Sequence, residues 1–481
     1  MFTFSDATEM NPVKPERTGW YFLLLLIATL GGGCETYVQQ NSSAAGAWVR
    51  GDVQGASAQY ASMARRSARG RDAVIWHLEE GAALRAAGQF RESNAALAAA
   101  EGRIDEYERR AKISVSDEAL ALVSNQATLP YEGRIYDKVM LNSYRALNYL
   151  QLADVRAARV EFNRVLRRQE DAIATKRRRL DREQRAIASA KQSGHRAAPM
   201  IDSKQVQSKL TATYAFLDKY KAQGSYKNPY ALFLRGLFFA TQATGNADLE
   251  TARHAYTEAG ANTSNRYLSR ELQRIEDRFA GKPLAPLVHV IFETGRAPRR
   301  IEERIDLPLI LVGEGNVPYV GLAFPVLHPQ YNYVSALNVQ TGGKTEQTQL
   351  LADMDAIIGK EFADELPIVI AKTILSSAAK AIAAYSVNRA AQKQDNDLQF
   401  LTAILTSAYQ AAVNRADTRT WTTLPKQIQY CSIELPSNRT VKLSGGGINS
   451  EIKLQSGNTI LLYVKSISPS APLLVTQTTL N

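Results

Sequence analysis

The chain has 481 residues, of which 22% are charged and 45% are hydrophobic, and its formal net charge is +11. This composition is typical of a globular protein and excludes a chain that is largely disordered. The length is sufficient for two or three domains. The chain has two cysteines, Cys34 and Cys431, and lipidation of Cys34, which is expected from the sequence around it, would leave Cys431 without a partner for a disulfide.

The first feature along the chain is a short apolar run, WYFLLLLIATLGGGC, which follows Lys14 and Arg17 and ends at Cys34. Its ten or so apolar residues are too few for a membrane span, which needs roughly twenty. They match the apolar core of an export signal. The three glycines resemble the cleavage site of a bacterial lipobox, so we expect a lipoprotein signal peptide over residues 1–33 and acyl chains, such as palmitate, on Cys34. An ordinary cleaved signal is the alternative.

The residues after the cysteine suggest a location. An Asp at position 35 would resemble an inner-membrane retention signal, so Glu35 favours anchoring to the outer membrane. We expect the protein to face the periplasm, although the sequence does not identify the face of the membrane. Residues 34–50 are polar and small, which predicts a short tether.

Between residues 51 and 280 the apolar spacing predicts helices throughout, and three helix pairs share one pattern. In the second helix of each pair, a small residue is followed four positions later by a bulky one; the small residues are Ser93, Ala158 and Ala252, and the bulky ones are Leu97, Phe162 and Tyr256. In the first helix, a small residue is followed three positions later by a larger one; these are Gly81, Ala146 and Gly236, then Leu84, Tyr149 and Phe239. The pattern resembles the tetratricopeptide repeat (TPR), with a plain helical bundle as the alternative.

Repeats of this kind stack into a superhelix with a concave groove. Arg145 and Arg235 fall at the same phase of two repeats, so we expect them to bind a partner in the groove, unless they tie helix to helix. The basic run Arg164 to Arg185 predicts a solvated, salt-bridged helix. Contact with anionic lipid, lipopolysaccharide or peptidoglycan is its alternative, and nucleic acid is not expected.

From residue 281 the pattern changes to short β-branched and aromatic runs bounded by Gly and Pro. The runs are LVHVIFET, LPLILVGE, VPYVGLAFPVL, YNYVSALNVQT, KQIQYCSIEL, RTVKLSG, EIKLQS and NTILLYVKSIS. A helical pattern returns between about residues 345 and 415. We therefore expect an α+β protein, with a TPR-like superhelix over 51–280 and a β-sandwich-like domain with a helical insertion over 281–481.

Four segments resemble a largely uncharacterised family of bacterial TPR-containing lipoproteins. They are LPYEGRIYDKVMLNSYRALNYL, GRAPRRIEERIDLP, LADMDAIIGKEFADELP and ADTRTWTTLP. The resemblance implies a location in the cell envelope and this order of domains, but no established activity.

Few residues suggest chemistry. The five histidines lack metal-ligand spacing, and TGGKT lacks the opening glycine of a phosphate loop because position 338 is Asn338. The acidic cluster contains Asp353, Asp355, Glu361, Asp364 and Glu365. It has the residue types of a glycosidase pair, although a helix start explains it more simply.

Three further features have a structural and a functional interpretation. One is the segment with Asp417, Arg419 and Trp421. Its Asp and Arg are expected to pair or to cap the backbone, with the Trp in the core; alternatively, the Trp stacks on a bound sugar to which the Asp and Arg hydrogen-bond. Cys431 reads as a buried hydrophobe. The segment Leu366–Val387 reads as a helix buried under the sandwich, or as an interaction helix.

We therefore expect a scaffold or adaptor for other envelope proteins, without catalytic residues, metal or cofactor, and leave homo-oligomer formation open. The alternative is a protein that binds or processes envelope polysaccharide or peptidoglycan.

Overall fold

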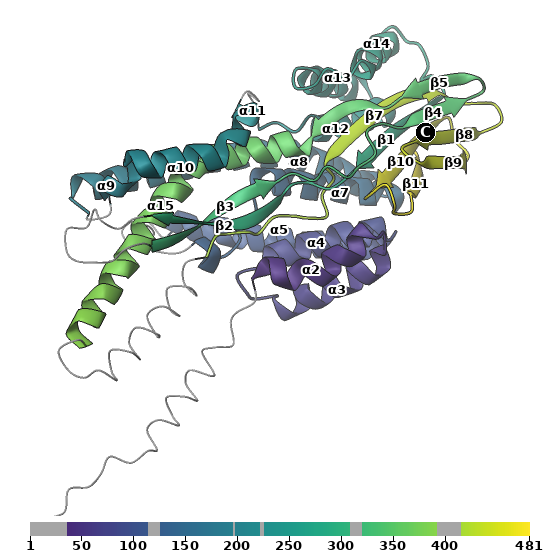
Figure 1. Ribbon diagram of the computed structural model, residues 1–481. Helices are drawn as coiled ribbons and strands as arrows, with labels where there is room; N and C mark the ends of the chain where they lie inside the picture. The colour runs from purple at the N-terminus through teal and green to yellow at the C-terminus, as the bar shows by residue number, and fades with distance from the viewer. Residues whose placement is uncertain (1–35, 114–125, 196–197, 222–225, 308–319, 392–414) are drawn as a thin grey trace, which may run out of the picture.

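The computed structural model describes residues 36–113, 126–195, 198–221, 226–307, 320–391 and 415–481. In these ranges the protein is of the α+β class, as expected, with a helical first part and strands that begin at Leu287 (Figure 1). The expected signal peptide and Cys34 lie outside the described residues. Among the helices that are described, none combines the length and the apolar character needed to cross a membrane.

The helical part consists mainly of long helices that pack against their neighbours in the chain. These are α2 (Tyr37–Val49), α3 (Val53–Arg66), α4 (Ala73–Ala86), α5 (Phe90–Ile113), α7 (Ile135–Gln151), α8 (Val155–Gln192), α12 (Pro229–Thr241), α13 (Asn246–Gly260) and α14 (Tyr267–Phe279). The shorter elements are η1 (Gln126–Thr128), α9 (Ala198–Ile201), α10 (Lys204–Tyr214), η2 (Ala215–Leu217) and α11 (Asp218–Lys221).

The tether expected over residues 34–50 is wrong from Tyr37 onward, because this segment forms helix α2. The Thr36 side chain accepts a hydrogen bond from the Gln39 N–H, and the Gln39 side chain accepts one from the Thr36 N–H. This capping box starts the helix. The small residues that suggested flexibility let α2 pack closely, and Ala44 and Trp48 are buried.

Three helical hairpins, α4–α5, α7–α8 and α12–α13, correspond to the three similar segments of the sequence. In two of these hairpins, a glycine of the first helix lies at the contact with the second helix. A Cβ atom on Gly81 would lie 2.5 Å from Leu97, and one on Gly236 would lie 2.6 Å from the Tyr256 ring. Since real Cβ atoms do not approach other atoms so closely, these two hairpins depend on the missing side chain.

The strands form three sheets. The strands are β1 (Leu287–Thr294), β2 (Arg299–Leu307), β3 (Val320–His328), β4 (Asn338–Thr341), β5 (Lys344–Gln347), β6 (Gln349–Asp353), β7 (Gln427–Glu434), β8 (Thr440–Gly445), β9 (Ile448–Lys453), β10 (Thr459–Ser466) and β11 (Leu474–Thr479). The largest sheet has the order β11-β10-β1-β7-β6, and in it β1 pairs parallel to β10. A second sheet has the order β5-β4-β8-β9, and β2 pairs with β3.

The strand expectations hold best for apolar runs. LVHVIFET and NTILLYVKSIS contain β1 and β10, which are buried along their whole length. The run LPLILVGE lies almost entirely outside the described residues, and the strand observed before it is the charged β2. In YNYVSALNVQT only the last four residues form a strand, β4.

The helical insertion begins at Met354, later than the expected residue 345, because β5 and β6 come first. Helix α15 (Met354–Ala391) includes the segment Leu366–Val387. Of this segment, Leu366, Ile368, Ile374 and Leu375 are buried, in agreement with the interpretation as a packed helix. The side chains beyond position 377 are outside the described part.

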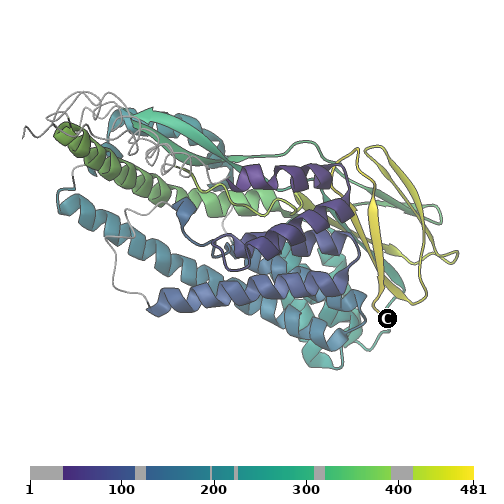
Figure 2. The same ribbon diagram turned by 90° about the horizontal axis from the view of Figure 1, so that it is seen from below.

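Helices α2 to α5 and α7 lie beside one another, and the C-terminal strands lie at one end of this layer (Figure 2). Hydrogen bonds join the two parts directly. Gln151 of α7 donates to Thr478 of β11, at 2.7 Å, and Tyr37 of α2 donates to the Thr420 carbonyl, at 2.9 Å.

Candidate functional site

Two charged residues interrupt the buried central strands of the large sheet. Glu293 of β1 and Lys465 of β10 are register partners, and the Lys465 Nζ atom lies 2.7 Å from the Glu293 Oε2 atom. Glu293 is 1% exposed. Charged groups are costly to bury unless they are paired, so this ion pair explains how the strands accept both residues.

Alternation along β10 places Tyr463 on the same face of the sheet as Lys465. This face meets helices α4 and α7. Tyr144 of α7 donates a hydrogen bond to the Glu293 Oε1 atom, at 3.0 Å, so both oxygens of Glu293 are engaged. Burial, followed by the nearby Glu293 charge, raises the pKa of both Tyr144 and Tyr463 well above the usual value. Both phenols therefore stay protonated at neutral pH.

Arg85, on the last turn of α4, faces these residues from the helical side. Its Nη1 atom donates to the Asn148 Oδ1 atom at 2.7 Å. Its guanidinium carbon lies 4.6 Å from the centre of the Tyr463 ring and 5.5 Å from that of Tyr144. Cation–π contacts of this kind stabilise a cation that has lost its water.

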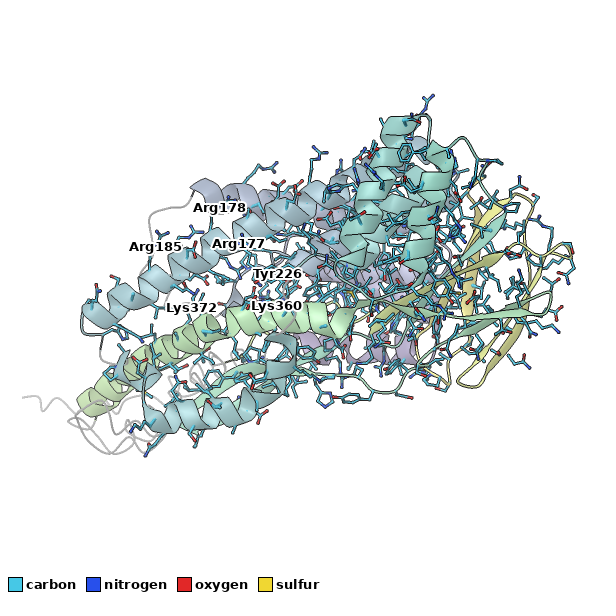
Figure 3. The ribbon with its side chains drawn as sticks, turned by 90° about the horizontal axis from the view of Figure 1, so that it is seen from above. Arg177, Arg178, Arg185, Tyr226, Lys360 and Lys372 are labelled. Carbon is cyan, nitrogen blue, oxygen red and sulfur yellow. The ribbon has the colours of Figure 1, made fainter. Side chains whose placement is uncertain are left out.

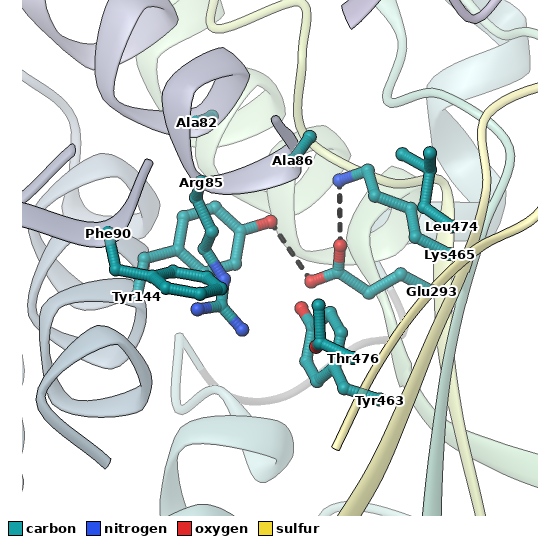
Figure 4. Close-up of a pocket in the computed structure, with 10 residues that line it drawn as sticks. All are labelled: Ala82, Arg85, Ala86, Phe90, Tyr144, Glu293, Tyr463, Lys465, Leu474 and Thr476. Atoms are coloured by element: carbon teal, nitrogen blue, oxygen red, sulfur yellow. Dashed lines mark hydrogen bonds and ion pairs between the residues drawn. The ribbon is translucent and has the colours of Figure 1, made fainter. Parts of the chain in front are cut away.

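A pocket opens between these groups, with Arg85 and Glu293 approaching it from opposite sides (Figure 4). Its wall is completed by Ala82, Ala86, Phe90, Leu474 and Thr476. The free volume of about 30 Å³ is room for about two water molecules. The helical part and the sheet thus form one small, partly charged cavity, which neither forms alone.

The acids expected at the start of α15 are engaged in ion pairs and a helix cap. Glu365 lies 2.8 Å from Arg134, 3.2 Å from Lys176 and 3.0 Å from Arg179. Burial opposes ionisation of Glu365, but Lys176, Arg134 and Arg179 outweigh it and hold its pKa well below the usual range. Glu365 therefore cross-links α7, α8 and α15.

The other acids of the cluster are engaged as well, and Glu361 shares Lys176 with Glu365. Glu361 lies 3.3 Å from Lys176, and Asp364 lies 2.7 Å from Lys360. Asp353 accepts a hydrogen bond from the Ala356 N–H, at 3.2 Å, as expected for a helix start. Asp355 pairs with Lys426, yet burial raises its pKa to about 6.

The segment from Asp417 to Trp421 is structural. Asp417 accepts a hydrogen bond from Arg419 at 2.7 Å and lies 3.7 Å from Arg134. Trp421 is fully buried, with its ring edge-on to Tyr144 at 5.9 Å. A fully buried ring has no face open to a sugar, so the interpretation as a core anchor holds and the sugar platform is wrong.

The two arginines expected in a groove have different surroundings. Arg145 is buried and pairs with Glu101 and Glu161, 3.0 Å from the latter, so it ties α7 to α5 and α8. Arg235 is half-buried, with its guanidinium 5.0 Å from the Phe239 ring. Burial lowers the pKa of Arg235. The structure does not bring these two residues together in the pocket.

The expected repeat-packing residues lie in the core. Those that are buried are Ala146, Ala158, Phe162, Phe239, Ala252 and Tyr256, and Tyr149 packs against the core from a half-buried position. Gly236 contacts Tyr256 as described above. The Phe162 ring packs against the Phe238 ring at a tilt of 36°, with ring centres 4.9 Å apart, so the second hairpin contacts the third.

The basic run of α8 is only partly neutralised. Arg164 and Arg168 pair with acids of α5, which fits a salt-bridged helix. Farther along, Arg177, Arg178 and Arg185 are exposed, whereas Lys360 and Lys372 on the neighbouring α15 are paired with Asp364 and Glu183 (Figure 3).

The remaining candidates are structural or show no ligand set. Cys431 is fully buried, and burial raises the pKa of its thiol. His289 accepts or donates a hydrogen bond with Tyr430 at 2.7 Å, and burial lowers its pKa to about 4. Within the described ranges, no group of three or more His, Cys, Asp or Glu side chains could hold a metal ion.

The sequence reasoning missed Arg85, Glu293, Tyr463 and Lys465. A signal was present, because Glu293 and Lys465 each stand in a run that otherwise reads as a buried strand. A charge at such a position needs a partner. The identity of the partner could not be read from the sequence, because β1 and β10 are far apart in the chain.

Comparison with protein-family models, with curated proteins and with solved structures found no match. The functional argument therefore depends on the geometry of this chain.

Proposed function

We propose that the chain is a lipoprotein anchored to the outer membrane of a bacterial cell envelope, where it binds other proteins as a scaffold or adaptor in envelope assembly or secretion. The observation that carries this proposal is the pocket between α4, α7 and the large sheet. Its lining combines aromatic rings with buried charges, and both parts of the chain contribute. Such side chains are enriched at protein-binding sites.

The helical hairpins support the finer proposal that the first part is a TPR-like superhelix. Small residues at the contact of the two helices and a bulky residue opposite them are what stacked helical repeats require. The second part, with its five-stranded and four-stranded sheets, is proposed to be a β-sandwich-like domain.

The membrane location is supported by the apolar run that ends at Cys34. Exposed arginines on α8 also favour a surface that carries anionic headgroups, since each basic residue close to such a surface contributes about 1 kcal/mol.

Binding is favoured over catalysis because the carboxylates that suggested an enzyme are engaged. Asp353 receives a backbone hydrogen bond, Asp355 is paired with Lys426, and Asp417 with Arg419. The alternative, a protein that binds or processes envelope polysaccharide or peptidoglycan, gains no support from these residues.

Site-specific photo-crosslinking in cells tests the proposal. A photoreactive phenylalanine analogue at Phe90, on the wall of the pocket, is expected to yield a crosslinked protein. The same analogue at Val160 of α8 is the control, because Val160 is 52% exposed and does not line the pocket. Equal yields at the two positions, or no product at Phe90, would contradict the proposal.

A further inference from the structure

The pocket contains more positive charge than its own acid neutralises. Glu293 is shared between Lys465 and Tyr144, which occupy its two oxygens. Arg85 forms no ion pair with a carboxylate anywhere in the described ranges, although it is only 7% exposed. A buried guanidinium is normally paired with an acid, so an anion is missing from the surroundings of Arg85.

The contacts of Arg85 hold the guanidinium in place without saturating it. A guanidinium carries five N–H donors in a planar fork, and the Asn148 side chain accepts from one of its nitrogens. The Tyr144 and Tyr463 rings stabilise the charge, but a ring face does not replace a carboxylate in the plane of the fork. Donors therefore remain for an anion that approaches through the pocket.

The size of the pocket limits the anion. Room for about two water molecules suits a planar carboxylate, which binds an arginine fork with two parallel hydrogen bonds, and is small for a tetrahedral phosphate. Ala82, Ala86 and Leu474 supply apolar wall, so the carboxylate is expected on a short aliphatic stem.

We propose that the pocket receives the carboxylate of an aspartate or glutamate side chain on a bound protein segment, with Arg85 as its anchor. The inference rests on the proposed function, because it names the chemistry by which that partner is recognised.

The test compares two small probes that differ by one group, N-acetylglutamate α-amide and N-acetylglutamine amide. Saturation-transfer NMR with the purified full chain, at constant ionic strength, measures weak binding of both. The acidic probe is expected to bind at least tenfold more tightly than the neutral one. Equal binding of the two probes would overturn the inference, and so would tighter binding of inorganic phosphate in competition with the acidic probe.

Two substitutions at Arg85 locate the effect. Arg85→Met, which removes the charge and keeps the length, is expected to reduce binding of the acidic probe to the level of the neutral probe. Arg85→Lys keeps the charge and loses the fork, so we expect several-fold weaker binding with the preference for the acid retained. Unchanged binding in a folded Arg85→Met protein, or unchanged affinity in Arg85→Lys, would contradict the assignment.

Arg159→Met is the matched control, because Arg159 also stacks on aromatic rings, at 4.9 Å from Phe239, but is paired with Asp248. It is expected to leave binding of the acidic probe unchanged. The outcomes separate the two proposals. If a protein crosslinks at Phe90 but the acidic probe binds no more tightly than the neutral one, only the recognition of a carboxylate is refuted. If the acidic probe binds more tightly but no protein crosslinks at Phe90, the adaptor function is refuted.

Discussion

The glycine at the contact of α12 and α13 gives a prediction whose sign can be worked out from the structure. In Gly236→Ala, the new Cβ atom would lie 2.6 Å from Cδ1 and 2.7 Å from Cε1 of the buried Tyr256 ring. Overpacking of this kind costs about 1–3 kcal/mol. The exchange of Gly for Ala inside a helix returns about 1 kcal/mol, so a net loss of up to about 2 kcal/mol is expected.

The same exchange at Gly102 serves as a control, because it changes helix propensity without creating a steric contact. Gly102 lies within α5, and a Cβ atom there would meet no atom within 4 Å. Gly102→Ala should therefore stabilise the protein by about 0.5–1 kcal/mol. Because both variants gain the same helix propensity, the difference between them, about 1–3 kcal/mol, measures the contact with Tyr256.

Urea unfolding followed by circular dichroism at fixed pH measures both free energies of unfolding. The reasoning requires that Gly102→Ala be more stable than the wild type, and that Gly236→Ala be less stable than Gly102→Ala by about 1–3 kcal/mol. If Gly236→Ala proved as stable as Gly102→Ala, the close approach of α12 and α13 would be wrong, and with it the packing proposed for the hairpins.

Three further predictions concern the core, the buried ion pairs and the anchor. Phe162→Ala removes a ring that is 1% exposed and should cost about 3–5 kcal/mol; a loss near zero in urea unfolding would place the ring in solvent. Glu365→Gln leaves buried cations without their acid and should cost about 3–5 kcal/mol, against less than about 0.5 kcal/mol for Glu170→Gln at an exposed site of α8. The pKa of Glu365 is lower in the folded state than in the unfolded state, so its ionised form stabilises the fold above the ordinary glutamate pKa, and this stabilisation is lost as pH falls below that value. The wild type should therefore lose more free energy of unfolding than Glu365→Gln between pH 6 and about pH 3. The same loss in both proteins would refute this. Cys34→Ser should abolish lipidation, and mass spectrometry that found an unmodified wild-type N-terminus would remove the lipoprotein claim.

The parts of the fold that were predictable are those encoded by local patterns. The small and bulky residues of each hairpin, such as Ala158 and Phe162, recur at helical spacing, so their burial follows from periodicity. The strands β1 and β10 are continuous apolar runs. Helix α2 was missed because small polar residues suggest a flexible segment until a partner surface is known.

Other elements depend on contacts between distant segments. Strand β2, RRIEERIDL, carries many charges, and its Arg300 is buried near Glu365 of α15. A local pattern does not predict such burial. The candidate site has the same origin, because it requires the parallel register that sets Lys465 beside Glu293 and the helix α4 that brings Arg85 to them. Arg145 is a residue type that often binds partners in a groove, but in the fold its charge is neutralised by Glu101 of α5 and Glu161 of α8.

The central claim is that the pocket at Arg85 holds a partner protein. The most direct measurement is the yield of the crosslinked product from the photoreactive analogue at Phe90, in cells that contain either the wild-type arginine or Arg85→Met at equal abundance. We predict that the yield falls at least tenfold in Arg85→Met while the protein remains folded and correctly located. An unchanged yield would contradict the account, because the partner would then be held at Phe90 without the charge of Arg85.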